Sequence, residues 1–251
     1  MSSPVLVTGA SGNVGRPVVA GLLAAGVPVR AARGRHLEEG DSHVKIAVLG
    51  ATGRTGRPLV EELLRRGHHV VAVVRDPGGA GLPDPVEVVG GDVRDDRVLL
   101  QALTGADAVV SVLGPRKGDP TLHREVAPLL VRAMAEAGVR RFVGVSGAGV
   151  DAEGDRKSRR DRIISGIIRR LPGDAVKDKV LEYGIWRASD TDWTLVRPPR
   201  LAEGPATGAV EHHASSSPRS TSIRRSDLAA FLADEVEQGR YVGRAPLVAQ
   251  G

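Results

Sequence analysis

Glycines spaced for close approach of the backbone to an anion occur twice in this chain. The copies read Gly9-Ala-Ser-Gly12-Asn-Val-Gly15 and Gly50-Ala-Thr-Gly53-Arg-Thr-Gly56. Each follows a short apolar run and precedes an amphipathic helical pattern, which is the strand–turn–helix context of a dinucleotide fingerprint. Glycine lets the backbone turn tightly, and the free N–H groups at a helix start attract a diphosphate. The sequence therefore predicts a dinucleotide site at these segments.

The second glycine segment opens a complete alternation of strand and helix patterns. Strands are expected at residues 45–49, 69–74, 86–89, 108–113, 141–146 and 193–197, and helices at 54–66, 96–103, 120–137 and 174–188. An extended piece near 207–212, a helix at 225–237 and a last strand near 241–248 complete the pattern. This alternation predicts an α/β fold, a doubly wound parallel sheet (Rossmann fold), with ligands at the carboxyl ends of the strands.

The first glycine segment belongs to a shorter unit, an additional N-terminal βαβ segment. It reads as strand 4–8, helix 14–25 and strand 27–32, followed by a polar linker. So short a unit cannot bury both faces of its strands. It must dock on the main sheet, exchange between subunits or remain partly disordered, unless it is only a remnant of a duplication. We therefore divide the chain into residues 1–43 and a main domain at 44–251, and expect the working site in the second copy.

The charge and the cysteine content limit which partners and ligands we expect. The net charge is +5, and only 5 of the 35 basic residues are lysine. This balance suits an anionic ligand or nucleic acid, but we favour a solvated arginine-rich surface and expect no nucleic-acid partner. Without cysteine the chain has no disulfides or thiolate ligands. We expect a cytoplasmic protein with no membrane contact, because signal-peptide and membrane-spanning patterns are missing.

From Val44 onward the sequence resembles the atypical short-chain dehydrogenases/reductases, in particular the NAD(P)H-binding proteins around biliverdin-IXβ/flavin reductase and the NmrA-like proteins. The matching pieces occur in the family's order. They are Gly50-Ala-Thr-Gly-Arg-Thr-Gly56, Val74-Arg-Asp-Pro77, Gly91-Asp-Val-Arg94, Val112-Leu-Gly114, Val145-Ser-Gly147, Asp192-Trp-Thr-Leu-Val-Arg-Pro-Pro199 and Ser226-Asp-Leu-Ala229. The ordered set, more than any single piece, carries the resemblance.

The resemblance implies a nicotinamide cofactor and the residues that hold it. These are Gly50, Thr52, Gly53, Arg54, Thr55 and Gly56 at the phosphates, Asp92 and Val93 at the adenine, Leu113, Gly114, Pro115 and Lys179 at the nicotinamide-side ribose, and Pro198 and Pro199 at the nicotinamide ring. Arg75 would face the adenosine ribose, where a guanidinium suits a 2′-phosphate. The neighbouring carboxylate, Asp76, would instead favour NAD. We expect NADPH over NADH.

The resemblance also implies a catalytic set of serine, tyrosine and lysine, which this chain holds only in part. Lys179 fits the lysine position, but Ala175 stands four residues earlier, where the family has its proton-donating tyrosine. Gly147 occupies the position that often carries the serine. The remaining candidates are Ser146, one residue early, and Tyr183, which stands one helical turn past Lys179.

Without that tyrosine, reduction of a simple ketone lacks its proton donor. A conjugated acceptor spreads the incoming charge and can take its proton from solvent. We therefore predict an NAD(P)H-dependent reductase of an apolar or anionic, flavin- or quinone-like small molecule. A non-catalytic NmrA-like NAD(P)-binding regulator, a biosynthetic epimerase or cyclase, and a basic DNA-binding module remain alternatives. The oligomeric state stays open.

The segment 151–172 and three histidines are the other candidate functional features. Residues 151–172 place Ile163, Ile164, Ile167 and Ile168 on one helical face among arginines, as in a mobile lid, a membrane-surface helix or a helix packed on the core. His123, His212 and His213 have no metal-binding spacing. We expect these three histidines on the surface, although His123 begins a helix near the site.

Overall fold

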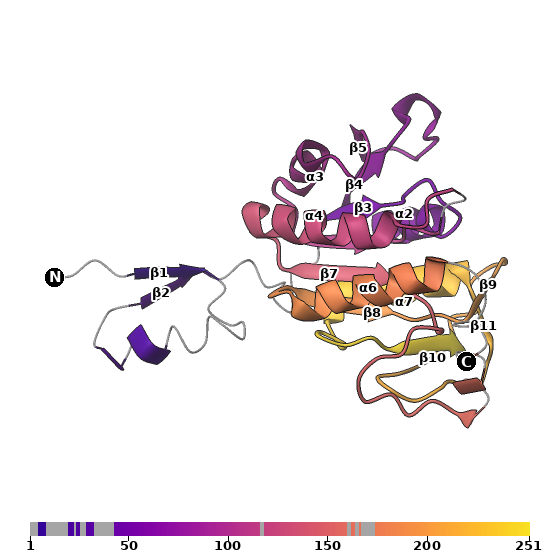
Figure 1. Cartoon of the computed structure of the whole chain (residues 1–251). Helices are drawn as coiled ribbons and strands as arrows, with labels where there is room; N and C mark the ends of the chain where they lie inside the picture. The colour runs from indigo at the N-terminus through magenta and orange to yellow at the C-terminus, as the bar shows by residue number, and fades with distance from the viewer. Residues whose placement is uncertain are drawn as a thin grey trace.

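The computed structural model describes residues 5–8, 20–22, 24–25, 29–32, 43–115, 118–159, 162–163, 166 and 174–251. Its centre is a six-stranded parallel sheet in the order β5-β4-β3-β6-β7-β8 (Figure 1). The strands are β3 (Lys45–Leu49), β4 (His69–Val74), β5 (Glu87–Gly90), β6 (Ala108–Ser111), β7 (Arg141–Val145) and β8 (Asp192–Val196). The order reverses between β3 and β6, which confirms the predicted doubly wound Rossmann fold.

Helices cover both faces of this sheet (Figure 1). One face packs against α2 (Gly56–Arg65) and α7 (Arg225–Gln238). The other packs against α3 (Asp96–Leu103), α4 (Leu122–Ala137) and α6 (Asp174–Ala188). Alternate residues of β3 enter the two cores, Ile46 on the first face and Ala47 on the second. The apolar strands are therefore buried on both sides, as expected for a parallel sheet.

Several boundaries depart from the sequence expectation. The strand predicted at 108–113 ends at Ser111, and the chain from 112 to 115 leaves the sheet. The strand predicted at 241–248 begins only at Leu247, because residues 241–243 form a turn in which Gly243 has φ 70°. Apolar residues continue past the true strand end in one case and begin early in the other, so composition alone misplaces both ends.

Four short strands form two separate pairs outside the six-stranded sheet. β9 (Arg200–Ala202) pairs in parallel with β11 (Ser222–Arg224), and neither strand was expected from the sequence. β10 (Val210–His213) pairs antiparallel with β12 (Leu247–Gln250). Along the chain, β9, β10 and β11 lie between β8 and α7, whereas β12 follows α7. The helix α7 returns to pack beside α2 (Figure 1).

The N-terminal unit forms a sheet of its own. β1 (Val5–Thr8) and β2 (Val29–Ala32) pair in parallel, Val5 opposite Val29, and neither joins the six-stranded sheet (Figure 1). The first glycine segment lies outside the described residues. Among the helices that are described, none is both long and apolar enough to cross a membrane.

Candidate functional site

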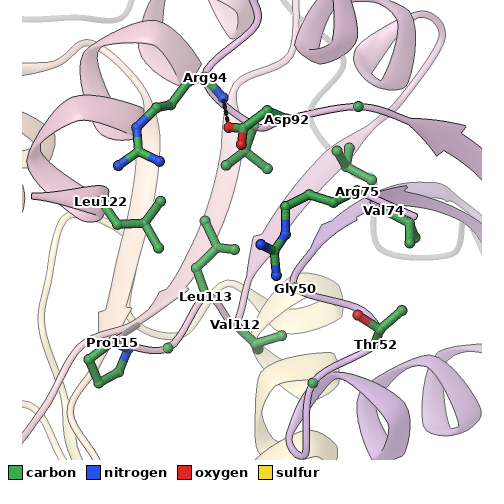
Figure 2. Close-up of a pocket in the computed structure, with 15 residues that line it drawn as sticks. Gly50, Thr52, Val74, Arg75, Asp92, Arg94, Val112, Leu113, Pro115 and Leu122 are labelled. Atoms are coloured by element: carbon green, nitrogen blue, oxygen red, sulfur yellow. Dashed lines mark hydrogen bonds between the residues drawn. The ribbon is translucent and has the colours of Figure 1, made fainter. Parts of the chain in front are cut away.

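A cavity of about 290 Å³ opens at the carboxyl ends of β3, β4, β5 and β6 (Figure 2). It lies where the strand order reverses, the usual place for ligands in such sheets. Nine residues predicted to bind the cofactor line it: Gly50, Thr52, Gly53, Arg75, Asp92, Val93, Leu113, Gly114 and Pro115. Six more residues line it that we did not predict: Val73, Val74, Gly91, Arg94, Val112 and Leu122. All but Leu122 lie within two residues of a predicted residue along the chain, so strand ends were a sufficient signal for them.

The glycine segment between β3 and α2 forms the floor of this cavity. Gly50 has φ 85°, and a Cβ there would lie 3.1 Å from the Leu113 amide nitrogen. A Cβ on Gly56 would collide with the Gly50 carbonyl oxygen, so only glycine lets α2 start against the turn. Among the described residues, the amides of Arg54 and Thr55 have no backbone or side-chain acceptor. Free amides at a helix start are the donor set that a diphosphate requires.

Arg75 and Asp76 take opposite directions at the end of β4. The Arg75 guanidinium extends toward the middle of the cavity (Figure 2). Asp76 is not part of the lining, and its Oδ2 lies 3.0 Å from the place that a Cβ on Gly79 would occupy. The carboxylate therefore faces its own turn, while the guanidinium faces the cavity.

Asp92 and Arg94 shape the opposite wall. The Arg94 amide donates to Asp92 Oδ1 at 2.9 Å, which closes the turn after β5 (Figure 2). The Arg94 guanidinium binds Asp119 at 2.6 Å and Glu125 at 2.7 Å. These ion pairs raise the pKa of Arg94 further above its ordinary value. Arg94 thus ties the cavity wall to the start of α4.

His123 is buried, so the expectation of a surface histidine was wrong for this residue. Its Nδ1 lies 2.8 Å from Asp178 Oδ2, and its Nε2 lies 3.0 Å from the carbonyl oxygen of Leu113. Asp178 also accepts the His123 and Arg124 amides. The packing of α4 against α6 creates this arrangement, which fixes the backbone of a cavity-lining residue.

Lys179 Nζ and Ser146 both lie at the carboxyl end of β7. Lys179 Nζ donates to the Val145 carbonyl at 2.7 Å and lies 2.9 Å from Glu182 Oε2. Burial lowers the pKa of Lys179, and the nearby Glu182 carboxylate partly offsets this. The Ser146 amide donates to Val196 at 2.7 Å, and its buried hydroxyl has no partner among the described residues. Lys179 is therefore held beside the residue that precedes Ser146.

The other predicted site residues lie outside the cavity lining. Tyr183 accepts a hydrogen bond from the Glu153 amide at 3.3 Å, on the segment that follows β7. The Pro198 carbonyl accepts from the Ala148 amide at 3.0 Å. The predicted residues that do not line the cavity are Arg54, Thr55, Gly56, Ser146, Lys179, Tyr183, Pro198 and Pro199. Their catalytic and cofactor roles stay predictions.

The remaining expectations concern His212, His213 and the isoleucines that follow β7. His212 Nδ1 lies 2.7 Å from the Tyr241 hydroxyl, and His213 is exposed. Ile163 has 63% of its surface exposed, whereas Ile164, Ile167 and Ile168 lie outside the described residues. In the part of the chain that is described, no three potential metal ligands gather.

Comparison with known proteins identifies the family. The profile of the NAD(P)H-binding family matches residues 50–238. A structure provisionally designated an exported protein of Burkholderia pseudomallei is 30% identical, with 82% of this chain and 99% of that chain covered at a TM-score of 0.64. One provisionally designated an NAD-dependent epimerase/dehydratase of Bacillus halodurans is 26% identical, with 83% and 94% covered and a TM-score of 0.66.

A third solved structure, provisionally designated an NADH-flavin reductase of Streptococcus pneumoniae, shares the fold at 24% identity, with 83% and 100% covered and a TM-score of 0.65. The chain belongs to the NAD(P)H-binding family, which confirms the resemblance to atypical short-chain dehydrogenases/reductases. Its cofactor is a nicotinamide dinucleotide.

Proposed function

We propose that this protein is an NADPH-dependent reductase of an apolar or anionic conjugated acceptor, such as a flavin or a quinone. The observation that carries the proposal is the cavity of about 290 Å³ with the glycine turn on one side and Arg75 reaching into it. The free amides of Arg54 and Thr55 bind the diphosphate, and Asp92 and Val93 contact the adenine. Leu113, Gly114 and Pro115 lead from there toward the nicotinamide end.

The orientation of two neighbouring side chains supports NADPH over NADH. Arg75 offers the cavity a planar cation with several donors, which matches a phosphate. Asp76, which would bind a free ribose 2′-hydroxyl, faces the 77–79 turn instead. The group that attracts a 2′-phosphate therefore faces the cavity, while the neighbouring Asp76 carboxylate, which would repel it, faces away.

The preference for a conjugated acceptor follows from the groups at the end of β7. A bound nicotinamide supplies the hydride, and the acceptor needs one further proton. Ala175 cannot provide a proton, and Tyr183, whose hydroxyl oxygen accepts from the Glu153 amide, lies outside the cavity lining. Lys179 Nζ, held by the Val145 carbonyl and Glu182, positions the ribose or the acceptor, while solvent supplies the proton. Ser146 offers a hydroxyl at the same strand end.

The duplicated glycine segments provide a matched test. We expect Gly53→Asp to weaken NADPH binding by at least about 100-fold, since its carboxylate would crowd the turn and repel the diphosphate. Gly12→Asp, the corresponding change in the first copy, should leave the affinity unchanged. Titration calorimetry measures both. Loss of binding in the Gly12 variant alone would move the cofactor to the other copy and overturn the site.

The acceptor class has its own readout. NADPH oxidation should be faster with free flavin than with a simple ketone, and the reverse order would contradict the proposed acceptor. The likeness to the Bacillus halodurans protein, which is 26% identical and provisionally designated an NAD-dependent epimerase/dehydratase, supports an epimerase as the second candidate. Product formation without net NADPH oxidation would identify it. Ala175 and Gly147, which replace the usual catalytic tyrosine and serine, favour a third candidate, an NmrA-like regulator. Such a regulator would bind NADPH without oxidising it.

A further inference from the structure

A guanidinium from the far end of the chain reaches the back of the glycine turn. Arg225, the first residue of α7, donates from one terminal nitrogen to Thr55 Oγ1 at 2.9 Å. Its Nε donates to Glu203 Oε1 at 2.8 Å. Only 11% of the Arg225 side chain is exposed. The packing of α7 beside α2 thus fixes a cation at the start of α2.

Thr55 occupies the N-cap of α2 but does not cap it. Its side chain makes no hydrogen bond to the amides of its own helix, and the residue is 7% exposed. A threonine at this position ordinarily accepts from an amide of the first turn. Here the hydroxyl oxygen accepts from Arg225 instead, so its one proton is available for another acceptor. The amides of Arg54 and Thr55, just before the helix, also stay available for an anion.

Glu203 neutralises the cations around the turn. The same carboxylate oxygen that binds Arg225 lies 3.7 Å from an Arg54 guanidinium nitrogen. The Glu203 and Arg54 side chains are 66% and 79% exposed, so this second pair is weak. A carboxylate beside a diphosphate site opposes binding, because like charges repel. Glu203 and an incoming diphosphate therefore compete for the same positive charge.

We propose that Arg225 positions the cofactor's diphosphate through Thr55, and that Glu203 limits the affinity by competing for Arg225 and Arg54. This inference rests on the proposed cofactor site at the second glycine turn. Arg225 withdraws the Thr55 hydroxyl oxygen from its helix and directs the hydroxyl proton, with the free amides, toward the phosphate oxygens. The C-terminal helix thereby completes a site that is otherwise built from β3 and α2.

The test compares binding of NADPH and of adenosine 2′-phosphate to the full chain by calorimetry. Arg225→Gln should weaken NADPH binding about tenfold, because a charged hydrogen bond behind the diphosphate is lost. Thr55→Val should weaken it similarly, and the double variant no further, since both changes remove one interaction. Adenosine 2′-phosphate has no diphosphate, so its affinity should stay unchanged in all three variants.

A variant that binds NADPH more tightly distinguishes the proposed electrostatic role of Glu203 from a purely structural one. Glu203→Gln should tighten NADPH binding severalfold at low salt, and the gain should shrink as salt screens the charges. The exposed pair of Arg132 and Asp96, 3.2 Å apart, provides control variants with the same charge changes, Arg132→Gln and Asp96→Asn. Both controls should bind NADPH like the wild type.

Three results would overturn the inference. They are unchanged NADPH affinity in Arg225→Gln, additive losses in the double variant, and equal weakening of adenosine 2′-phosphate. Should Arg225→Gln fail to fold, Arg225→Lys, which keeps the charge, takes its place. Its affinity for NADPH should lie between that of the wild type and that of Thr55→Val. If the wild type bound no NADPH, the cofactor site itself would fail, which is a different outcome.

Discussion

Lys179 shows how the surroundings of a single residue set its chemistry. It donates to the Val145 carbonyl, pairs with Glu182 and is largely removed from water. Burial lowers its pKa below the ordinary 10.5. The folded state therefore releases this proton at a lower pH than the unfolded state does. Between the two pKa values the unfolded chain binds more protons, so stability rises with pH in that window.

This linkage predicts a pH-dependent difference between wild type and a variant. Lys179 should make the free energy of unfolding increase with pH, from its lowered pKa in the folded state up to 10.5. Lys179→Met combined with Glu182→Gln should remove this increase without leaving a buried charge. Urea unfolding from pH 7 to 10 measures it. The exposed Lys177→Met on the same helix is the control, and an identical slope in the double variant would refute the assignment.

The segment that follows β7 is anchored to the end of β8 by buried charges. Arg197, with no exposed side-chain surface, binds both Asp155 oxygens at 2.6 and 2.7 Å. Lys157 Nζ bonds the Ala148 and Val150 carbonyls and lies 2.8 Å from Asp151. Residues 151–157, the first part of the segment for which a lid was one of three interpretations, are thus fixed to the sheet.

Breaking this anchor should be costly. Asp155→Ala leaves the Arg197 cation buried without its partner, and we expect a loss of about 3–5 kcal/mol in the free energy of unfolding. Adding Arg197→Met should recover part of that loss, because the isolated charge is removed. Asp96→Ala at the exposed Arg132 pair should cost less than about 1 kcal/mol. Chemical denaturation measures all three. A loss in Asp155→Ala as small as that of the surface control would show that water reaches Arg197.

At the scale of the whole molecule, the main sheet closes without the N-terminal unit. All six of its strands, and the helices on both faces, lie between residues 45 and 238. β1 and β2 pair only with each other among the described strands. The family match covers residues 50–238 and omits them. These observations support, as a proposal, the division at residue 43.

Removing residues 1–43 tests this division. The chain from 44 to 251 should lose less than about 1 kcal/mol of stability, or roughly 2–4 °C in Tm. It should still bind one NADPH, because the second glycine turn is intact. Thermal unfolding and calorimetric stoichiometry give the two readouts. A much larger loss of stability, or binding of two nucleotides by the full chain, would mean that the first unit docks on the sheet or holds a cofactor.

Sequence periodicity determined the elements and their order. The strands at 45–49 and 69–74 and the helices at 96–103 and 174–188 coincide with those predicted, since alternation and helical spacing are local properties. The glycine turn was equally local, because Gly50 has a positive φ and a Cβ on Gly56 would collide with the Gly50 carbonyl oxygen. Most of the cavity lining followed, because carboxyl ends of parallel strands meet at one edge.

Only the tertiary structure decided which distant side chains meet. Thr55 and Arg225 are 170 residues apart, and His123 and Asp178 are 55 apart. The strands β9 and β11, each three residues long, are too short to carry a period. Such contacts depend on how α7 returns to α2 and how α4 packs on α6. The local sequence around each residue does not specify this packing, because the packing arises from burial of apolar surface across the whole sheet.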